Sequence, residues 1–324
     1  MTGTGRSDAI APPDPMSGLE ADTLAGTRPS SLWRDTLSNI LRQRSAVVGL
    51  TILSTLILVA VLAPIIAPFD PIISMLDIGE ENIRRGLPPC IHLLGCPTDI
   101  PQHLMGLDSN LRDEFSRVIY GAQISLRIGF LTVSGAIVVG STIGAVAGFL
   151  GGAVDNVLMR IMDVVLSFPS LILAIAIVTV LGPGLVNAQL AIAIVSIPIY
   201  ARVMRASVLA TRENDYVTAS RALGESAAGI LTRRILPNAL TPLIVQGTLG
   251  IGGAILEVAA LSFVGLGATP PEAEWGAMIA DDRNLFFSAP HLIFFPGVAI
   301  TLTVLAFNLL GDGLRDALDP RLNR

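Results

Sequence analysis

Long stretches without a charged side chain alternate with shorter polar segments along the sequence. The uncharged stretches cover residues 46–69, 128–154, 164–201, 235–256 and 284–311. A helix that crosses a bilayer needs about 20 mostly apolar residues, and each stretch provides them. The third is long enough for two spans, and Gly182-Pro183-Gly184 marks a turn near its middle. The pattern therefore predicts an all-α integral membrane protein with six transmembrane helices.

The segment before the first apolar stretch has a different character. Residues 1–31 are rich in Pro, Gly, Ser, Thr and Asp, and they offer too little apolar surface to offset the entropy lost on folding. We expect a disordered cytoplasmic tail there. Residues 32–45 combine Leu and Ile with Arg, a pattern that favours an amphipathic helix lying at the membrane interface. The six-helix membrane domain would then occupy residues 46–324.

Composition narrows the class of protein further. Hydrophobic residues make up 52% of the chain and charged residues 15%, with a mean hydropathy of +0.67. A net charge of −5 is too small to indicate a nucleic-acid partner. All 21 basic residues are Arg, and a phosphate-binding P-loop needs a Lys, so any ATP or Mg²⁺ would be bound by a partner chain. We find no nucleophile–base pair and no metal-ligand spacing, and we expect no enzyme activity, cofactor or metal site in this chain.

The distribution of Arg indicates the orientation of the spans. Cytoplasmic loops of membrane proteins carry an excess of basic residues. With both termini in the cytoplasm, most of the Arg residues fall in the tail, the 150–163 loop, the 202–236 loop and the C-terminal end. The other side, including an external loop at 69–127, holds only Arg84, Arg85, Arg112, Arg117, Arg127 and Arg283. The sequence therefore predicts that the N- and C-termini are both cytoplasmic.

Two cysteines lie in the external loop, Cys90 and Cys96. Their spacing differs from the CxxC pattern of metal and redox sites. In an oxidising compartment a disulfide between them is expected. Two unpaired thiols are the alternative.

The longest cytoplasmic loop, residues 202–236, has helical patterning. We expect Asp215 to cap a short helix over 216–223, and Gly224 to take the left-handed conformation after its C-terminus. A second helical stretch is expected over 226–235. An isolated helix of this length is marginal in water, so it needs a groove on a partner or, alternatively, on its own bundle.

This loop resembles the EAA loop of ABC importer permeases in two stretches, Asp215-Tyr216-Val217-Thr218-Ala219-Ser220-Arg221-Ala222-Leu223-Gly224 and Arg234-Ile235-Leu236-Pro237-Asn238. Ala219, Gly224 and Leu236-Pro237 match the family pattern, whereas Thr218 replaces its Glu and removes a carboxylate. In the family this loop carries the coupling helix, which docks into a cleft of the ATPase subunit. The resemblance assigns coupling to Asp215, Tyr216, Ala219, Ser220, Arg221, Gly224 and Pro237.

Other segments resemble one branch of the family, the C-type permeases of dipeptide/oligopeptide and nickel importers. The matching segments include Gly106-Leu107-Asp108, Tyr120-Gly121-Ala122-Gln123-Ile124-Ser125-Leu126, Leu261-Ser262-Phe263-Val264-Gly265-Leu266-Gly267 and Asn308-Leu309-Leu310-Gly311-Asp312-Gly313-Leu314-Arg315-Asp316-Ala317-Leu318-Asp319-Pro320-Arg321. The branch has Thr at Leu107, Gly at Leu111 and Arg at Gln123. The 77–102 loop has no counterpart in it.

The resemblance implies a type I ABC importer permease fold in the bacterial inner membrane. It implies a second homologous permease subunit, two ATPase subunits or one fused double ATPase, an extracytoplasmic solute-binding protein and membrane lipid as partners. The implied function is ATP-driven import of di- and oligopeptides, with nickel chelates or haem as alternative cargo. An ion-coupled secondary transporter is the alternative from another class.

Charged residues outside the coupling loop leave further alternatives open. The external Asp108, Arg112, Asp113 and Arg117 are candidates for docking the binding protein, or they brace their own loop. Glu257, within the fifth span, and Asp163, at the start of the third, are candidates for an ion relay because intramembrane acids are costly. Partnered structural carboxylates are the simpler interpretation of both.

Overall fold

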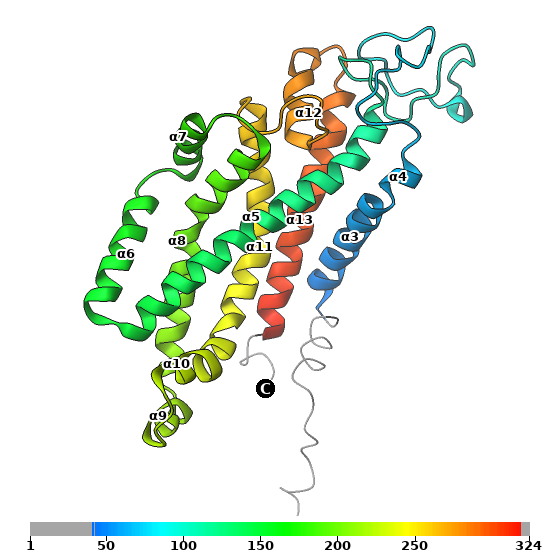
Figure 1. Ribbon diagram of the computed structural model, residues 1–324. Helices are drawn as coiled ribbons and strands as arrows, with labels where there is room; N and C mark the ends of the chain where they lie inside the picture. Colours follow the sequence, from blue (N-terminus) through cyan, green and yellow to red (C-terminus); the bar gives the residue numbers. More distant parts are fainter. Residues whose placement is uncertain (1–40, 42, 319–324) are drawn as a thin grey trace, which may run out of the picture.

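A computed structural model describes residues 41 and 43–318, and this part of the chain is helical, without strands (Figure 1). The longer helices are α3 (Arg44–Val61), α5 (Glu114–Leu150), α6 (Gly152–Leu166), α7 (Ser170–Leu181), α8 (Leu185–Arg212), α11 (Leu236–Phe263) and α13 (His291–Leu318). The shorter ones are α4 (Ala63–Ile66), η1 (His92–Leu94), α9 (Asp215–Ala222), α10 (Ala227–Gly229), the π-helix η2 (Ile230–Ile235), α12 (Trp275–Asp282) and η3 (Arg283–Leu285). The expected tail 1–31, residues 32–40 and 42 of the expected interfacial helix 32–45, and Asp319-Pro320-Arg321 lie outside the described residues.

Five of these helices are long and apolar enough to cross a membrane. A sixth span results if α6 and α7 count together, because they are bent by 90° at the break between them. The uncharged 164–201 stretch divides at Gly182-Pro183-Gly184, as predicted, but the span before this turn begins earlier, in α6. Its first part completes α6 and forms α7, and α8 begins directly after Gly182-Pro183-Gly184.

Two segments expected as loops are helical. Residues 114–127, assigned to the external loop, form the start of α5, whose N-terminus is capped by Asp113 accepting a hydrogen bond from the Ser116 N–H. Residues 152–163, assigned to a cytoplasmic loop, belong to α6. The charges in both segments hid the helices, because a search for uncharged stretches ends wherever a charge begins.

Helices α5 and α8 pack backbone to backbone along their length. Gly140 and Gly144 of α5 lie against the backbone of Ile197 and Ala201 in α8, and a Cβ added at Gly140 would lie 2.6 Å from the Ile197 carbonyl oxygen. Small residues four positions apart allow this close approach. The Gly140/Gly144/Gly148 spacing thus serves bundle packing.

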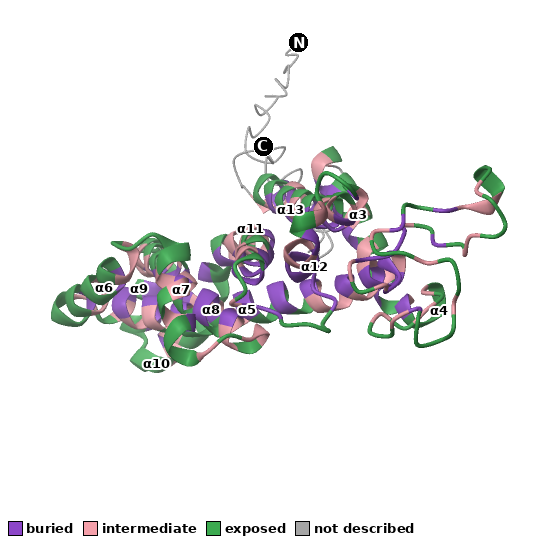
Figure 2. Cartoon of the chain, turned by 90° about the horizontal axis from the view of Figure 1, so that it is seen from above, coloured by how far each residue is buried: buried purple, intermediate pink, exposed green. Residues whose placement is uncertain are grey.

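Buried residues concentrate along the facing sides of α5, α8, α11 and α12, while most residues of α6 and the outer faces of the other helices are exposed (Figure 2). The largest apolar cluster joins α5, α7, α8 and α11, and extends to Val217 of α9 and Ile230 and Ile235 of η2. The segment that contains the expected coupling helix is therefore continuous with the bundle core.

Candidate functional site: a projecting helical hairpin and a buried external cluster

Helix α9 begins and ends close to the predicted positions. Its N-cap is Asn214, whose side chain makes no capping bond, and Asp215 is the first helical residue. The expectation that Asp215 caps the helix is therefore wrong by one position, because two adjacent residues have cap-forming side chains. Gly224 has a φ of +81°, which confirms the predicted left-handed residue after the helix.

One face of α9 is anchored on the chain itself. The Val217 side chain is 0% exposed and packs in the cluster that includes Ile230 and Ile235. Ser220 is also buried, and its hydroxyl donates to the Tyr216 carbonyl oxygen at 2.9 Å. Ser220 is therefore wrong as a direct contact for a partner, because it lies on the anchored face.

The opposite face of α9 is free within the described structure. Asp215, Tyr216, Ala219 and Arg221 are exposed, and Leu223 at the end of the helix is 88% exposed. Figure 1 shows α9 projecting at the end of the bundle opposite α12 and the external loop. An exposed Leu beside a Tyr and an Arg is the kind of surface that protein partners bind.

Helix α9 is the first arm of a helical hairpin, and the second arm, formed by α10 and η2, leads directly into α11. Ser226 accepts a hydrogen bond from the Gly229 N–H, and Arg234 pairs with Glu225 at 3.0 Å. The predicted helical stretch over 226–235 thus forms as α10 and η2. Pro237 lies in the first turn of α11, directly after the π-helix η2. Proline is tolerated in the first turn of a helix because its missing N–H needs no partner there.

Side-chain contacts join α8, the helix that leads into α9, to its neighbours. The Ser207 hydroxyl of α8 donates to the Ala239 carbonyl oxygen of α11 at 2.9 Å. Arg205 of α8 binds Asp155 of α6 with two of its guanidinium nitrogens, at 2.5 and 2.6 Å. Arg212 donates to the Gly148 carbonyl oxygen of α5 at 2.9 Å. The helix that carries α9 is therefore fixed to three other helices of the bundle.

The charged residues that we predicted on the external side form a buried cluster at the end of the bundle opposite α9. Asp108, Arg112, Asp113 and Arg117 are all nearly inaccessible to solvent. Asp108 accepts from Arg112 Nε at 2.7 Å, and Arg117 Nε lies 3.4 Å from the same carboxylate. Asp281 of α12 lies 3.5 Å from Arg112. These contacts favour the alternative interpretation, in which the residues brace their own loop, since Asp113 is likewise bound to His103 and Ser116 and all four side chains are buried away from a binding protein.

Several members of this cluster were not found from the sequence. His103 lies between Asp113 and Glu80, with Nδ1 2.8 Å and Nε2 3.0 Å from their carboxylates. Burial lowers the pKa of His103, but the hydrogen bonds and charges of Asp113 and Glu80 outweigh it and raise that pKa. Glu114 is fully buried, and neither of its carboxylate oxygens has a hydrogen-bond partner in the described residues.

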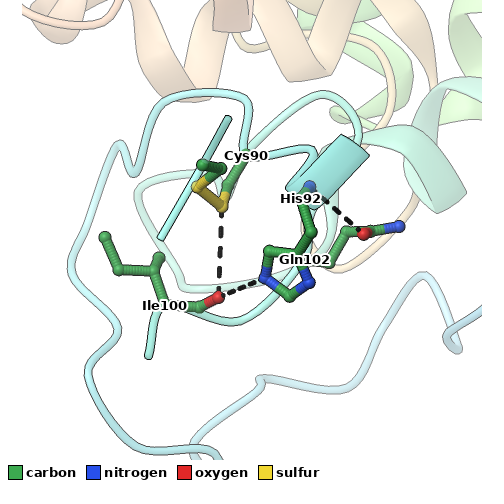
Figure 3. The surroundings of a disulfide bond; sticks show 5 residues. Cys90, His92, Ile100 and Gln102 are labelled. Carbon is green, nitrogen blue, oxygen red and sulfur yellow. Dashed lines mark hydrogen bonds between the residues drawn. A yellow bond between two sulfur atoms is a disulfide. The ribbon is translucent and has the colours of Figure 1, made fainter. Parts of the chain in front are cut away.

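Cys90 and Cys96 are joined by a disulfide in this external region, with their Cα atoms 5.5 Å apart. Figure 3 shows the surrounding contacts, in which the His92 ring bonds the Ile100 carbonyl oxygen at 2.8 Å and the His92 N–H donates to the Gln102 side chain at 3.4 Å. Within the described residues, no group of three His, Cys, Asp or Glu side chains could hold a metal ion.

The two intramembrane acids each have a partner. Glu257 accepts a hydrogen bond from the Ser170 hydroxyl at 3.1 Å, and Asp163 pairs with Arg202 at 2.6 Å. These contacts favour the structural interpretation over an ion relay for both residues.

The bundle and its projecting hairpin are those of an ABC importer permease. The family of binding-protein-dependent transport system inner membrane components matches residues 140–324, and the N-terminal transmembrane domain of oligopeptide transport permease C matches residues 31–89. The inward-facing MetNI methionine ABC transporter contains a chain of similar fold, with a TM-score of 0.53 and 19% identity over 63% of this chain and 97% of that one.

Closer relatives narrow the family. The dipeptide transport system permease protein DppC of Alkalihalophilus pseudofirmus is 43% identical, covering 98% of this chain and 99% of the relative. DppC of Haemophilus influenzae is 44% identical, covering 87% of this chain and 92% of the relative. The glutathione transport system permease protein GsiD of Pectobacterium atrosepticum is 41% identical, covering 90% of this chain and 91% of the relative. The chain belongs to the dipeptide/oligopeptide permease family of ABC importers, as the sequence predicted.

Proposed function

We propose that this chain forms half of the translocation pathway of an ATP-driven importer of di- and oligopeptides. The observation that carries the proposal is the α9 hairpin, which is anchored through Val217 and exposes Tyr216, Ala219 and Leu223 at the end of the bundle. The names of the relatives, which are dipeptide and glutathione permeases, support a peptide cargo. Nickel chelates or haem are the alternative cargo for the same machinery.

The proposed topology has six spans, with α6 and α7 together forming the third, and both termini in the cytoplasm. The Arg distribution supports this orientation, because α9, η2 and the end of α8 carry Arg212, Arg221, Arg233 and Arg234. A disulfide at the opposite end agrees with an oxidising compartment there.

The proposed partners follow from this topology. ATP and Mg²⁺ would be bound by ATPase subunits, because the chain has no Lys for a P-loop. A second permease subunit would complete the pathway, and a solute-binding protein would deliver the peptide from the external side.

In the proposed mechanism the exposed face of α9 sits in a cleft of an ATPase subunit. ATP binds the closed ATPase pair more tightly than the open pair, and this difference in affinity shifts the population of conformations. Because α9 is continuous with α8 and, through η2, with α11, movement of the ATPase subunits would re-orient these spans. The pathway would then change from an inward-facing to an outward-facing state.

The ion-coupled alternative depends on intramembrane ionisable groups that are free to change charge. Glu257 and Asp163 already bind Ser170 and Arg202, which disfavours this mechanism. Uptake that survives a proton or sodium uncoupler but requires ATP would favour the importer.

The test is Ala219→Asp in the complex reconstituted with its ATPase subunits. A carboxylate on the docking face should weaken ATPase association by about tenfold, as expected for a change of roughly 1.4 kcal/mol at an interface. Leu94→Asp, an exposed apolar residue at the other end of the chain, is the matched control. Unchanged association and uptake in Ala219→Asp would reject coupling through α9.

A further inference from the structure

A cavity of about 330 Å³ lies between the outer part of α5 and the beginning of α8. Its apolar wall comes from Ile124, Ile128 and Leu131 of α5 and from Leu185 of α8. Its volume falls within the range of about 300–1,000 Å³ that is usual for small-molecule sites.

The rim of this cavity carries one positive and one negative side chain. Arg127 comes from α5, and Glu272 comes from the loop between α11 and α12. That loop is held over the start of α8, because the Gly184 N–H donates to the Leu266 carbonyl oxygen at 3.1 Å. Within the described residues, neither charged side chain forms an ion pair or a hydrogen bond, with the other or with any third group.

In the proposed topology, the length of α5 puts the cavity at the level of the lipid headgroups. At 1.5 Å per residue, Arg127 is about 35 Å from Leu150 at the other end of α5. The hydrocarbon core of a bilayer is about 30 Å thick. A tilted α5 that ends at one membrane surface therefore places Arg127 close to the opposite surface.

Exposed apolar side chains continue from the cavity into the membrane. Between Arg127 and Leu150, α5 exposes Phe130, Leu131 and Val138, with exposed fractions of 59%, 45% and 65%. Val186, at the start of α8, lines the cavity and is 66% exposed. The cavity thus opens onto a face that lipid chains can cover.

We propose that this cavity binds a phospholipid with a zwitterionic headgroup that ends in a primary ammonium, as in phosphatidylethanolamine. Arg127 binds the phosphate, Glu272 accepts hydrogen bonds from the ammonium, and one acyl chain follows Leu131 and Val138. A primary ammonium has N–H donors for the carboxylate, whereas a choline headgroup has none. The assignment rests on the position of the cavity at a membrane surface and is independent of the transported cargo.

The test uses the full chain in its transporter complex, exchanged into vesicles of phosphatidylethanolamine, phosphatidylcholine or phosphatidylglycerol, with retained lipid counted by native mass spectrometry. The wild type should retain phosphatidylethanolamine two- to fivefold better than phosphatidylcholine, the ratio expected for a partly exposed ion pair. Glu272→Gln should remove this preference and leave phosphatidylglycerol retention intact. Arg127→Gln should reduce retention of all three phospholipids by a similar factor.

Arg84→Gln is the matched control, because it neutralises another exposed external Arg away from the cavity. Equal retention of phosphatidylethanolamine and phosphatidylcholine by the wild type would overturn the proposal. Displacement of the retained lipid by a dipeptide would also overturn the proposal, because the cavity would then be a binding site for the transported solute. None of these outcomes depends on ATPase coupling, so they are distinguishable from a failure of the proposed function.

Discussion

Charged side chains are buried at one end of this molecule and exposed at the other. At the external end, Asp108, Arg112 and Arg117 lie at i, i+4 and i+9 and are buried together. At the α9 end, Asp215 and Arg221 lie on a short helix with a similar density of charge, and they are exposed. Charge in the sequence therefore does not distinguish a docking surface from an internal brace. The deciding feature is whether another segment of the chain covers it, as α12 covers the external cluster.

The largest expected effect comes from breaking the external brace. Asp108 binds Arg112 Nε and the Asn110 and Arg112 N–H groups. Asp108→Ala would remove the carboxylate that Arg112 and Arg117 share, leaving Arg112 only the longer contact to Asp281, and we expect the free energy of unfolding to fall by about 3–5 kcal/mol. Urea or thermal unfolding in detergent measures it.

The matched variant for this experiment is Asp215→Ala, which removes an exposed acid at the other end. Its effect on unfolding should stay within about 0.5 kcal/mol. Similar losses in the two variants would contradict the contrast between a buried brace and an exposed hairpin.

A second prediction concerns the α5–α8 contact that connects the two ends. Gly144→Ala would place a methyl group against the Ala201 backbone, and we expect a loss of about 1–3 kcal/mol in stability from overpacking. Gly135→Ala is the control on the same helix, since nothing lies within 4 Å of a Cβ at that position. The two variants should differ in unfolding midpoint, and equal midpoints would reject close packing at Gly144.

A third prediction separates the two faces of α9. Val217→Ala removes two buried methyl groups and should cost about 1–2 kcal/mol of stability, at roughly 0.8 kcal/mol per group. Leu223→Ala should leave stability unchanged, because Leu223 is 88% exposed, and should instead weaken binding to the ATPase subunits. Unfolding and ATPase pull-down on both variants provide the comparison. A loss of stability in Leu223→Ala would show that this end of α9 folds back on the bundle.

The smallest expected effect is the pH dependence of the external cluster. The folded-state pKa of His103 is raised above its ordinary value of 6.5. Protonation of His103 therefore contributes stability that is fully present below the unfolded pKa and is lost as pH rises through the folded pKa. His103→Gln should flatten the dependence of stability on pH in that window, and an unchanged slope would show that His103 stays neutral between Glu80 and Asp113.

The sequence revealed the features that depend on local chemistry. Uncharged stretches locate the spans, and Gly224 marks the turn after α9 because a left-handed residue favours Gly. The outer part of α5 was missed, since the charges of Glu114 and Arg117 suggested a solvated loop. Both side chains are buried, and Arg117 donates to the carbonyl oxygens of Pro71 and Pro271, which are distant in sequence. No local pattern reports such contacts.

The 90° bend between α6 and α7 was missed for a related reason. Pro169 breaks the helix locally, but the angle between the two helices depends on how they pack against α8. The caps of α9 differ by only one position from the prediction, because Asn214 and Asp215 are both favourable N-cap residues. Local signals therefore predict that these helices exist more accurately than they predict where each helix begins and ends.

The most direct test of the account is the accessibility of a thiol at position 223. The two cysteines of the chain form a disulfide, so Leu223→Cys adds a single free thiol. In inside-out vesicles that lack the ATPase subunits, a membrane-impermeant maleimide should label it, and adding the ATPase subunits should protect it. Phe287→Cys, at a position 96% exposed between η3 and α13, is the control and should be labelled only from the external side. Labelling of Leu223→Cys from outside, or labelling that the ATPase subunits leave unchanged, would contradict coupling through α9.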